Sequence, residues 1–310
     1  MIRKKIGFLT AFLLIVTMLL ALSLSSSCTK NTESSKPTVT TEQVKESKAS
    51  ETTSIQTTAA KITSNASTTA SETSAAQTSE SAPLATIGYG ADYNPVINPA
   101  DFTTKIDNKY FPLVPGTTFI YEGISEKGNE HNEMAVEDET KTILGITCIV
   151  VEDTVRVDGQ IIEKTLDWYA QDKNGNVWYF GEDSKEYKDG KVIGTGGSWE
   201  AGVKGAKPGI IMEASPKIGD SYRQEYYKNE AEDMADILSL SESVSVKYGS
   251  FTDCLKTRDY TPLEPNVVEN KYFAPGVGEV LITLEKGGTE RMELIEIKTE
   301  AKDWSYKVSW

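Results

Sequence analysis

The stretch "DWYAQDKNGNVWYF" (residues 167–180) is the clearest β-sheet signal in the chain. Two aromatic-rich runs flank a polar Asn-Gly pair, and this pattern is typical of two β-strands joined by a tight turn. Because alternate residues of a strand face opposite sides of a sheet, we expect Trp168 and Trp178 on one face. Tyr169 and Tyr179 are then expected on the other.

The same signal recurs along the chain. Asp-Gly pairs separate apolar runs in "RVDGQIIE" and "YKDGKVI", and "TTFIYEGI" alternates β-branched and aromatic residues with others. Long strands joined by tight turns predict an antiparallel meander. One short helix is expected at residues 229–238, within the acidic and apolar stretch "YYKNEAEDMADILSL".

The region after residue 88 reads as two copies of one unit, residues 89–210 and residues 211–310. "PGTTFIYE" (115–122) aligns with "IGDSYRQE" (218–225), and Cys148 aligns with Cys254. The prediction is therefore a mostly-β fold with at most one or two short helices. Two tandem curved antiparallel sheets would either face each other as a sandwich or share edges as one incomplete barrel.

The N-terminus has the order of a secretory signal: basic residues, an apolar run at residues 6–24, small residues, then Cys28. The apolar run is also nearly long enough to span a bilayer as a helix. Residues 29–88 contain no aromatic residue and are rich in Ser and Thr. Such a segment cannot bury enough apolar surface to offset its ordering entropy, so residues 28–88 are predicted to be a disordered tether.

The stretch that ends at Cys28 resembles a bacterial lipoprotein signal, although Ser25 stands where that family usually has an aliphatic residue. This resemblance implies that residues 1–27 are removed and that the Cys28 thiol is acylated, which anchors the chain in the cell membrane on its extracytoplasmic side. Plain secretory cleavage and a retained helix are the alternatives.

Three further stretches, "IDNKYFPLVPGTTFIYEG", "DWYAQDKNGNVWYFGED" and "YFAPGVGEV", resemble an uncharacterised family of bacterial secreted lipoproteins. The likeness covers roughly residues 98–298. More broadly, the layout is similar to the LolA-like half-barrel lipoproteins. The resemblance implies a fold and a location, and it implies no particular chemistry.

Charge and composition exclude several classes of function. A net charge of −14 repels nucleic acid. His131 is the only histidine, which leaves no His-rich zinc site. Asp172, Asn174 and Asn176 have the spacing of the first ligands of a calcium loop, but the strand pattern that follows favours a hairpin turn. We expect neither a cofactor nor a metal.

Five aromatic residues are candidates for an apolar groove that would hold a lipid or glycan: Trp168, Tyr169, Trp178, Tyr179 and Trp199. The same residues could instead form the hydrophobic core between sheets, and the pattern favours this reading. Cys148 and Cys254 could form a disulfide, as exported proteins often do, or remain two separate buried thiols.

These observations favour a non-catalytic, lipid-anchored binding protein for an apolar or cell-envelope ligand. One alternative is a structural or interaction protein of the cell surface. Another is a hydrolase that would use a pair of carboxylates, such as Glu152-Asp153, Glu182-Asp183 or Glu232-Asp233. The oligomeric state is left open.

Overall fold

A computed structural model describes residues 93–125 and 127–299. The predicted signal peptide, Cys28 and the predicted tether lie outside these residues. Strands make up most of the described chain, which confirms the mostly-β prediction, and a short 3₁₀ helix, η2 (Pro99–Asp101), precedes them. No helix among these residues is long and apolar enough to cross a membrane.

The strands divide between the two halves of the described chain. The first half contains β1 (Phe102–Thr103), β2 (Thr117–Ser125), β3 (Gly128–Ile143), β4 (Ile146–Val157), β5 (Gln160–Asp172), β6 (Val177–Lys188), β7 (Lys191–Gly194), β8 (Trp199–Glu200) and β9 (Lys207–Met212). The second half contains β10 (Ser221–Arg223), β11 (Glu225–Tyr226), β12 (Met234–Val246), β13 (Gly249–Tyr260), β14 (Val268–Ala274), β15 (Gly278–Lys286) and β16 (Arg291–Thr299).

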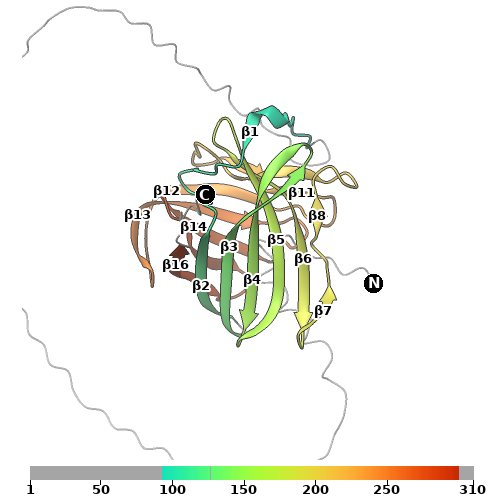
Figure 1. Ribbon diagram of the computed structural model, residues 1–310. Helices are drawn as coiled ribbons and strands as arrows, with labels where there is room; N and C mark the ends of the chain where they lie inside the picture. Colours follow the sequence, from blue (N-terminus) through green and yellow to red (C-terminus); the bar gives the residue numbers. More distant parts are fainter. Residues whose placement is uncertain (1–92, 126, 300–310) are drawn as a thin grey trace, which may run out of the picture. The chain divides into compact units, whose positions relative to one another are not determined.

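All these strands belong to one 16-stranded sheet with the order β10-β12-β13-β14-β15-β16-β2-β3-β4-β5-β6-β9-β11. Two meanders, β2 to β6 and β12 to β16, are joined because β16 pairs antiparallel with β2, where Leu294 lies opposite Tyr121 (Figure 1). The two halves therefore share edges. Of the sandwich and the incomplete barrel that the sequence left open, this arrangement is the incomplete barrel.

A short segment, Ser221–Tyr226, bridges the two ends of this sheet. Its first part, β10, pairs with β12, and its second part, β11, pairs with β9. Between them, the backbone N–H of Gln224 donates to the carbonyl of Asp233 at 2.9 Å. The sheet is thus nearly closed, and it has an inner and an outer face.

Tight turns with positive φ join the long strands, as the Asp-Gly pairs predict. Asp158 and Gly159, between β4 and β5, have φ values of 47° and 79°. The pair Asp189 and Gly190, between β6 and β7, has values of 51° and 72°. Both central residues of these turns lie in the left-handed region, which is the geometry that a two-residue hairpin favours.

The prediction of a helix at residues 229–238 is wrong. The segment begins as a turn, and β12 starts at Met234 and pairs with both β10 and β13. Ala235 and Ile237 are buried in the core, so the sheet pairing and burial outweigh the modest helix propensity of the segment.

The two halves share a local turn that the sequence alignment places at matching positions. Gly116 has φ 83°, and its N–H donates to Val136 of β3. Gly219 has φ 92°, and its N–H donates to Ile237 of β12. A duplication would produce such a match, and the duplication itself stays a prediction.

Cys148 and Cys254 are both free and buried. Cys148 lies on β4 and Cys254 on β13, and five strands separate these two in the sheet. The disulfide that the sequence left open is therefore absent, because matching positions of the two halves are not neighbours in this sheet.

The closure of the sheet can be tested at Gly209 of β9. A Cβ atom at this position would come within 2.3 Å of the Gln224 backbone, so we expect Gly209→Ala to lower the free energy of unfolding by about 2–3 kcal/mol. At Gly249 the nearest atom would be 3.5 Å away, so Gly249→Ala should change stability by less than about 0.5 kcal/mol. Urea denaturation measures both, and equal effects would contradict the close approach of β9 to the bridging segment.

Candidate functional site

Carboxylates line the inner face of the sheet. Along β5, the side chains of Glu163, Thr165, Asp167 and Tyr169 follow one another at every second position, and all four are buried. Period-2 alternation puts these four on the same face. Tyr169 lines a cavity that residues of β2, β3, β14 and β16 also line, and this identifies their shared face as the inner one.

The cavity has a volume of about 80 Å³ and a mixed lining. Its polar wall consists of Asn132, Asp153, Glu163, Lys271 and Glu279. Its apolar wall includes Phe111, Phe119, Tyr121, Met134 and Met292. A volume of this size accommodates a few water molecules or the head of a small ligand.

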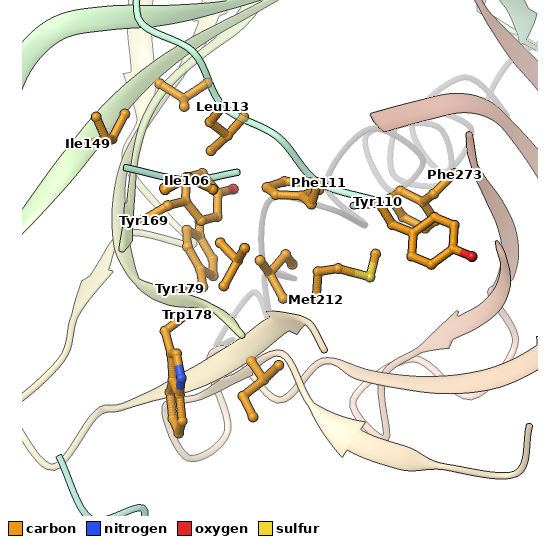
Figure 2. Close-up of a cluster of buried hydrophobic side chains, with 14 of the residues drawn as sticks. Ile106, Tyr110, Phe111, Leu113, Ile149, Tyr169, Trp178, Tyr179, Met212 and Phe273 are labelled. Atoms are coloured by element: carbon orange, nitrogen blue, oxygen red, sulfur yellow. The ribbon is translucent and has the colours of Figure 1, made fainter. Parts of the chain in front are cut away.

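The segment Ile106–Leu113, here called the plug, supplies part of the apolar wall. Figure 2 shows Phe111 of the plug between Tyr169 and Phe273, at ring-centroid distances of 5.6 Å and 6.5 Å. The buried Asn108 fixes the plug, because its side-chain amide donates to the carbonyls of Gly175 at 2.9 Å and Glu213 at 3.1 Å. The plug is therefore held by hydrogen bonds to the turn after β5 and to the chain after β9.

Lys271 of β14 is fully buried among carboxylates. Its Nζ lies 3.3 Å from Asp259 Oδ2 and 3.4 Å from Glu269 Oε2. Gln224 of the bridging segment also donates to Asp259 Oδ2, at 3.0 Å. Burial lowers the pKa of Lys271, but the surrounding carboxylates, Asp259 first, together hold that pKa above its ordinary value. Lys271 therefore stays charged and links β14 to β13.

Glu269 and Glu279, which flank this lysine on the inner face, titrate near neutrality. Burial raises the pKa of Glu269 to about 7, against the lowering effect of the Lys271 charge. Burial likewise raises the pKa of Glu279 to about 7. One ammonium group therefore does not neutralise all the acids around it.

A second cluster, the carboxylate trio, consists of Asp167, Glu182 and Glu225. Tyr179 donates its hydroxyl to Asp167 Oδ1 at 2.5 Å, and the Trp199 indole N–H donates to Glu225 Oε2 at 2.9 Å. Among the described residues, Asp167 Oδ2, Glu225 Oε1 and both carboxylate oxygens of Glu182 have no hydrogen-bond partner. The trio thus buries four acceptor atoms without donors.

Burial and mutual repulsion keep the trio from ionising in the ordinary range. Burial raises the pKa of Glu182 well above its usual value, and the charges of Asp167 and Glu225 raise it further. Burial also raises the pKa of Asp167, although the hydrogen bond from Tyr179 lowers it. An ionised carboxylate in such a place needs a positive charge beside it.

A β-bulge explains why sequence reasoning missed Glu182. Tyr169 lies opposite Tyr179, yet Asp167 lies opposite Glu182, so β6 has one extra residue between these pairs. Simple alternation would place Glu182 on the face opposite Tyr179. The bulge, at Gly181 with φ 130°, returns it to the inner face beside Asp167.

The five aromatic candidates are all buried, and they divide between the two faces as the sequence predicts. Tyr169 stacks on Tyr179 at 4.9 Å, and Tyr179 meets Trp199 edge-on at 5.3 Å, so these three lie together on the inner face. Trp178 packs against Phe102 on the opposite face. Trp168 of that face lies 3.3 Å under the ammonium group of Lys141. The structure therefore brings three of the five together near the cavity.

The other sequence candidates are placed away from this interior. His131 of β3 is half-buried and lies 3.2 Å from Glu133. Asp172 organises the hairpin turn predicted for its stretch, because its carboxylate accepts from the backbone of Asn174 at 2.8 Å and of Asn176 at 3.0 Å. Within residues 93–125 and 127–299, no group of three or more His, Cys, Asp or Glu side chains is arranged to hold a metal ion.

The adjacent acid pairs are split by the strand geometry. Asp153 is buried on the inner face, where Asn132 donates to both of its oxygens, while Glu152 is half-buried and bonds Lys164. Asp183, next to Glu182, likewise pairs with a lysine on the partly exposed side. Neighbouring acids therefore belong to different faces, and the carboxylates that meet come from different strands.

Comparisons with known proteins add no family. No protein-family model and no curated protein matches the chain. Among solved structures, a proposed lipoprotein from Parabacteroides distasonis has a TM-score of 0.35 at 14% identity, covering 62% of this chain and 100% of its own. A β-barrel-like protein of the domain of unknown function DUF1849 from Brucella abortus has a TM-score of 0.34 at 14% identity, covering 61% and 99%. Likenesses this distant carry no argument, so the family resemblance stays a prediction.

The cost of the unpartnered acids can be measured with Glu182→Gln. A carboxyl whose folded-state pKa is raised contributes stability that is fully present below its ordinary pKa and is lost as pH rises toward the raised value. We therefore expect Glu182→Gln to stabilise the fold at pH 8, on the order of 1–3 kcal/mol, and to have a smaller effect at pH 5.

Asp183→Asn is the matched control, because Asp183 is the next residue and is partly exposed. It should change the free energy of unfolding by less than about 0.5 kcal/mol at either pH. Destabilisation by Glu182→Gln at pH 8 would mean that the Glu182 carboxylate has a favourable partner in the folded protein.

Proposed function

We propose that this chain is a lipid-anchored extracytoplasmic protein that binds a small ligand inside its nearly closed sheet and does not catalyse a reaction. In this proposal Cys28 carries the lipid, and residues 29–88 act as a spacer between the membrane and the folded part. The observation that carries the binding function is the inner cavity, whose lining combines apolar side chains with ionisable ones.

The lining of the cavity supports binding better than a purely structural role. Small-molecule sites are concave, mostly apolar, and contain a few polar groups that fix orientation. Phe119 and Met292 supply apolar surface, while Asp153 and Glu163 supply carboxyl groups at the same cavity. A core with no ligand would be more stable with hydrocarbon in place of these carboxylates.

The plug sets the size of ligand that the described conformation admits. Phe111 and Leu113 line the cavity, and a volume of about 80 Å³ is smaller than a lipid chain requires. The apolar envelope ligand expected from the sequence would therefore need the plug to move. A compact ligand fits without that change.

The absence of catalysis is part of the proposal, and two facts support it. The single histidine bonds Glu133 on β3 and does not line the cavity. The neighbouring acid pairs that suggested a hydrolase are divided between the faces of the sheet, as Glu182 and Asp183 illustrate.

A structural role at the cell surface is the second candidate. The burial of all five aromatic candidates favours it, because a tightly packed aromatic core needs no ligand. The two candidates differ in whether a small molecule accompanies the purified protein.

Native mass spectrometry of the full-length chain, purified in detergent, separates these two candidates. We expect a mass that exceeds that of the lipid-modified polypeptide by a small molecule, and we expect the excess to disappear when the protein is denatured. The mass of the modified polypeptide alone would favour the structural role.

The anchor can be tested with Cys28→Ser. A lipid needs the thiol, so this variant should incorporate no radioactive palmitate and should leave the membrane fraction of the producing bacterium. Ser27→Ala keeps a small residue before the cysteine and should remain labelled and membrane-bound. Membrane association of Cys28→Ser without label would instead indicate a retained N-terminal helix.

A further inference from the structure

The inner face of the sheet carries more acid than base. Its buried acids, from five different strands or their ends, include Asp153, Glu163, Asp167, Glu182, Glu225 and Glu269. The bases beside them are Lys271, which already contacts Asp259 and Glu269, and the half-buried Lys127, whose ammonium group interacts with Glu130 and Glu163. A second buried cation, Arg223, lies over the rings of Tyr93 and Tyr226. Buried acids on the inner face therefore outnumber the buried bases beside them.

One acceptor atom without a donor belongs to a residue on the same face of β5 as two cavity-lining residues. Glu163 and Tyr169 both line the cavity, and Asp167 lies between them on the same face of β5. Asp167 is fully buried, and its Oδ2 has no hydrogen-bond partner among the described residues. Glu182, beside it on β6, is 2% exposed and has two such atoms.

Aromatic rings stand beside the same carboxylates. Tyr169 forms part of the cavity wall and stacks on Tyr179, whose hydroxyl is bonded to Asp167. Figure 2 shows Tyr169 and Tyr179 close together, with Phe111 of the plug facing them. A cation is attracted both by carboxylates and by the faces of aromatic rings, so the two features favour the same class of ligand.

We propose that the ligand of the cavity is a small organic cation, with an ammonium-type head beside Asp153 and Glu163 and a short apolar part against Phe119 and Met292. This inference rests on the proposed binding function. The carboxylates of the polar wall would repel an anion. No three acids among the described residues come together as metal ligands, which favours an organic cation over a divalent metal ion.

The size of the cavity further limits which ligands can bind. A volume of about 80 Å³ leaves space for a head group and a few carbon atoms, with the plug in its described position. n-Butylammonium has both parts, and n-butanol has a similar shape without the charge. n-Butyrate has the opposite charge. These three compounds separate the contribution of charge from that of shape.

The test is isothermal titration of the full-length chain in detergent with n-butylammonium, n-butanol, n-butyrate and calcium chloride. The inference predicts that n-butylammonium binds at least about tenfold more tightly than either of the other organic compounds, and that calcium gives no heat of binding. Equal binding of n-butylammonium and n-butanol would overturn the inference and leave the proposed binding function in place. Binding of calcium alone, or of none of the four, would overturn it as well.

Two variants locate the bound cation. Glu163→Gln keeps the shape of a cavity-lining residue and removes its charge, so it should weaken n-butylammonium about tenfold and leave n-butanol unchanged. Asp183→Asn removes a charge from the partly exposed side and should change neither affinity. If Glu163→Gln binds n-butylammonium as tightly as the parent chain does, the cation is not in this cavity. A small molecule seen by native mass spectrometry would then still uphold the proposed function.

Discussion

Lys271 and the carboxylates buried beside it connect several strands of the inner face. Lys271 is fully buried and contacts Asp259 and Glu269, and thereby ties β13 to β14 on the inner face. Gln224, in the segment that bridges the ends of the sheet, bonds the same Asp259. Closure of the sheet and neutralisation of its interior therefore involve one connected group of side chains. Removing a single member would leave a buried charge without its partner.

Among the described residues, four oxygen atoms of the carboxylate trio have no such partner. Each acid costs stability when it ionises in the interior, so folding by itself would favour neutral residues at these positions. Protonation removes that cost at acid pH, and a bound cation would remove it at neutral pH. The aromatic rings of Tyr169 and Tyr179 pack beside Asp167. They are compatible with a bound cation as well as with a protonated acid.

The sequence predicts the strands better than it predicts their interior. Local patterns predict the Asp-Gly and Asn-Gly turns and the antiparallel meander. They also predict that Trp168 and Tyr169 lie on opposite faces. The short helix at 229–238 was wrong, because pairing of β12 on both edges outweighs a local preference.

The acidic interior could be found only in part from the sequence. The alternation of Glu163, Asp167 and Tyr169 is visible in it, but hydrophobic patterning treats such a face as exposed. The inward position of Glu182 depends on the bulge at Gly181. Glu225 is positioned by the bridging segment, which pairs with β9. Both depend on contacts between distant parts of the chain, which no local pattern contains.

Infrared spectroscopy of the carboxyl groups measures whether the buried acids are protonated. In the full-length chain without ligand at neutral pH, we expect the carbonyl absorption of protonated carboxylic acids, because burial raises the pKa of Glu182 and its neighbours. Addition of n-butylammonium should weaken that absorption as the acids ionise beside the cation. A ligand-free spectrum that shows only ionised carboxylates would mean that burial does not keep these acids neutral.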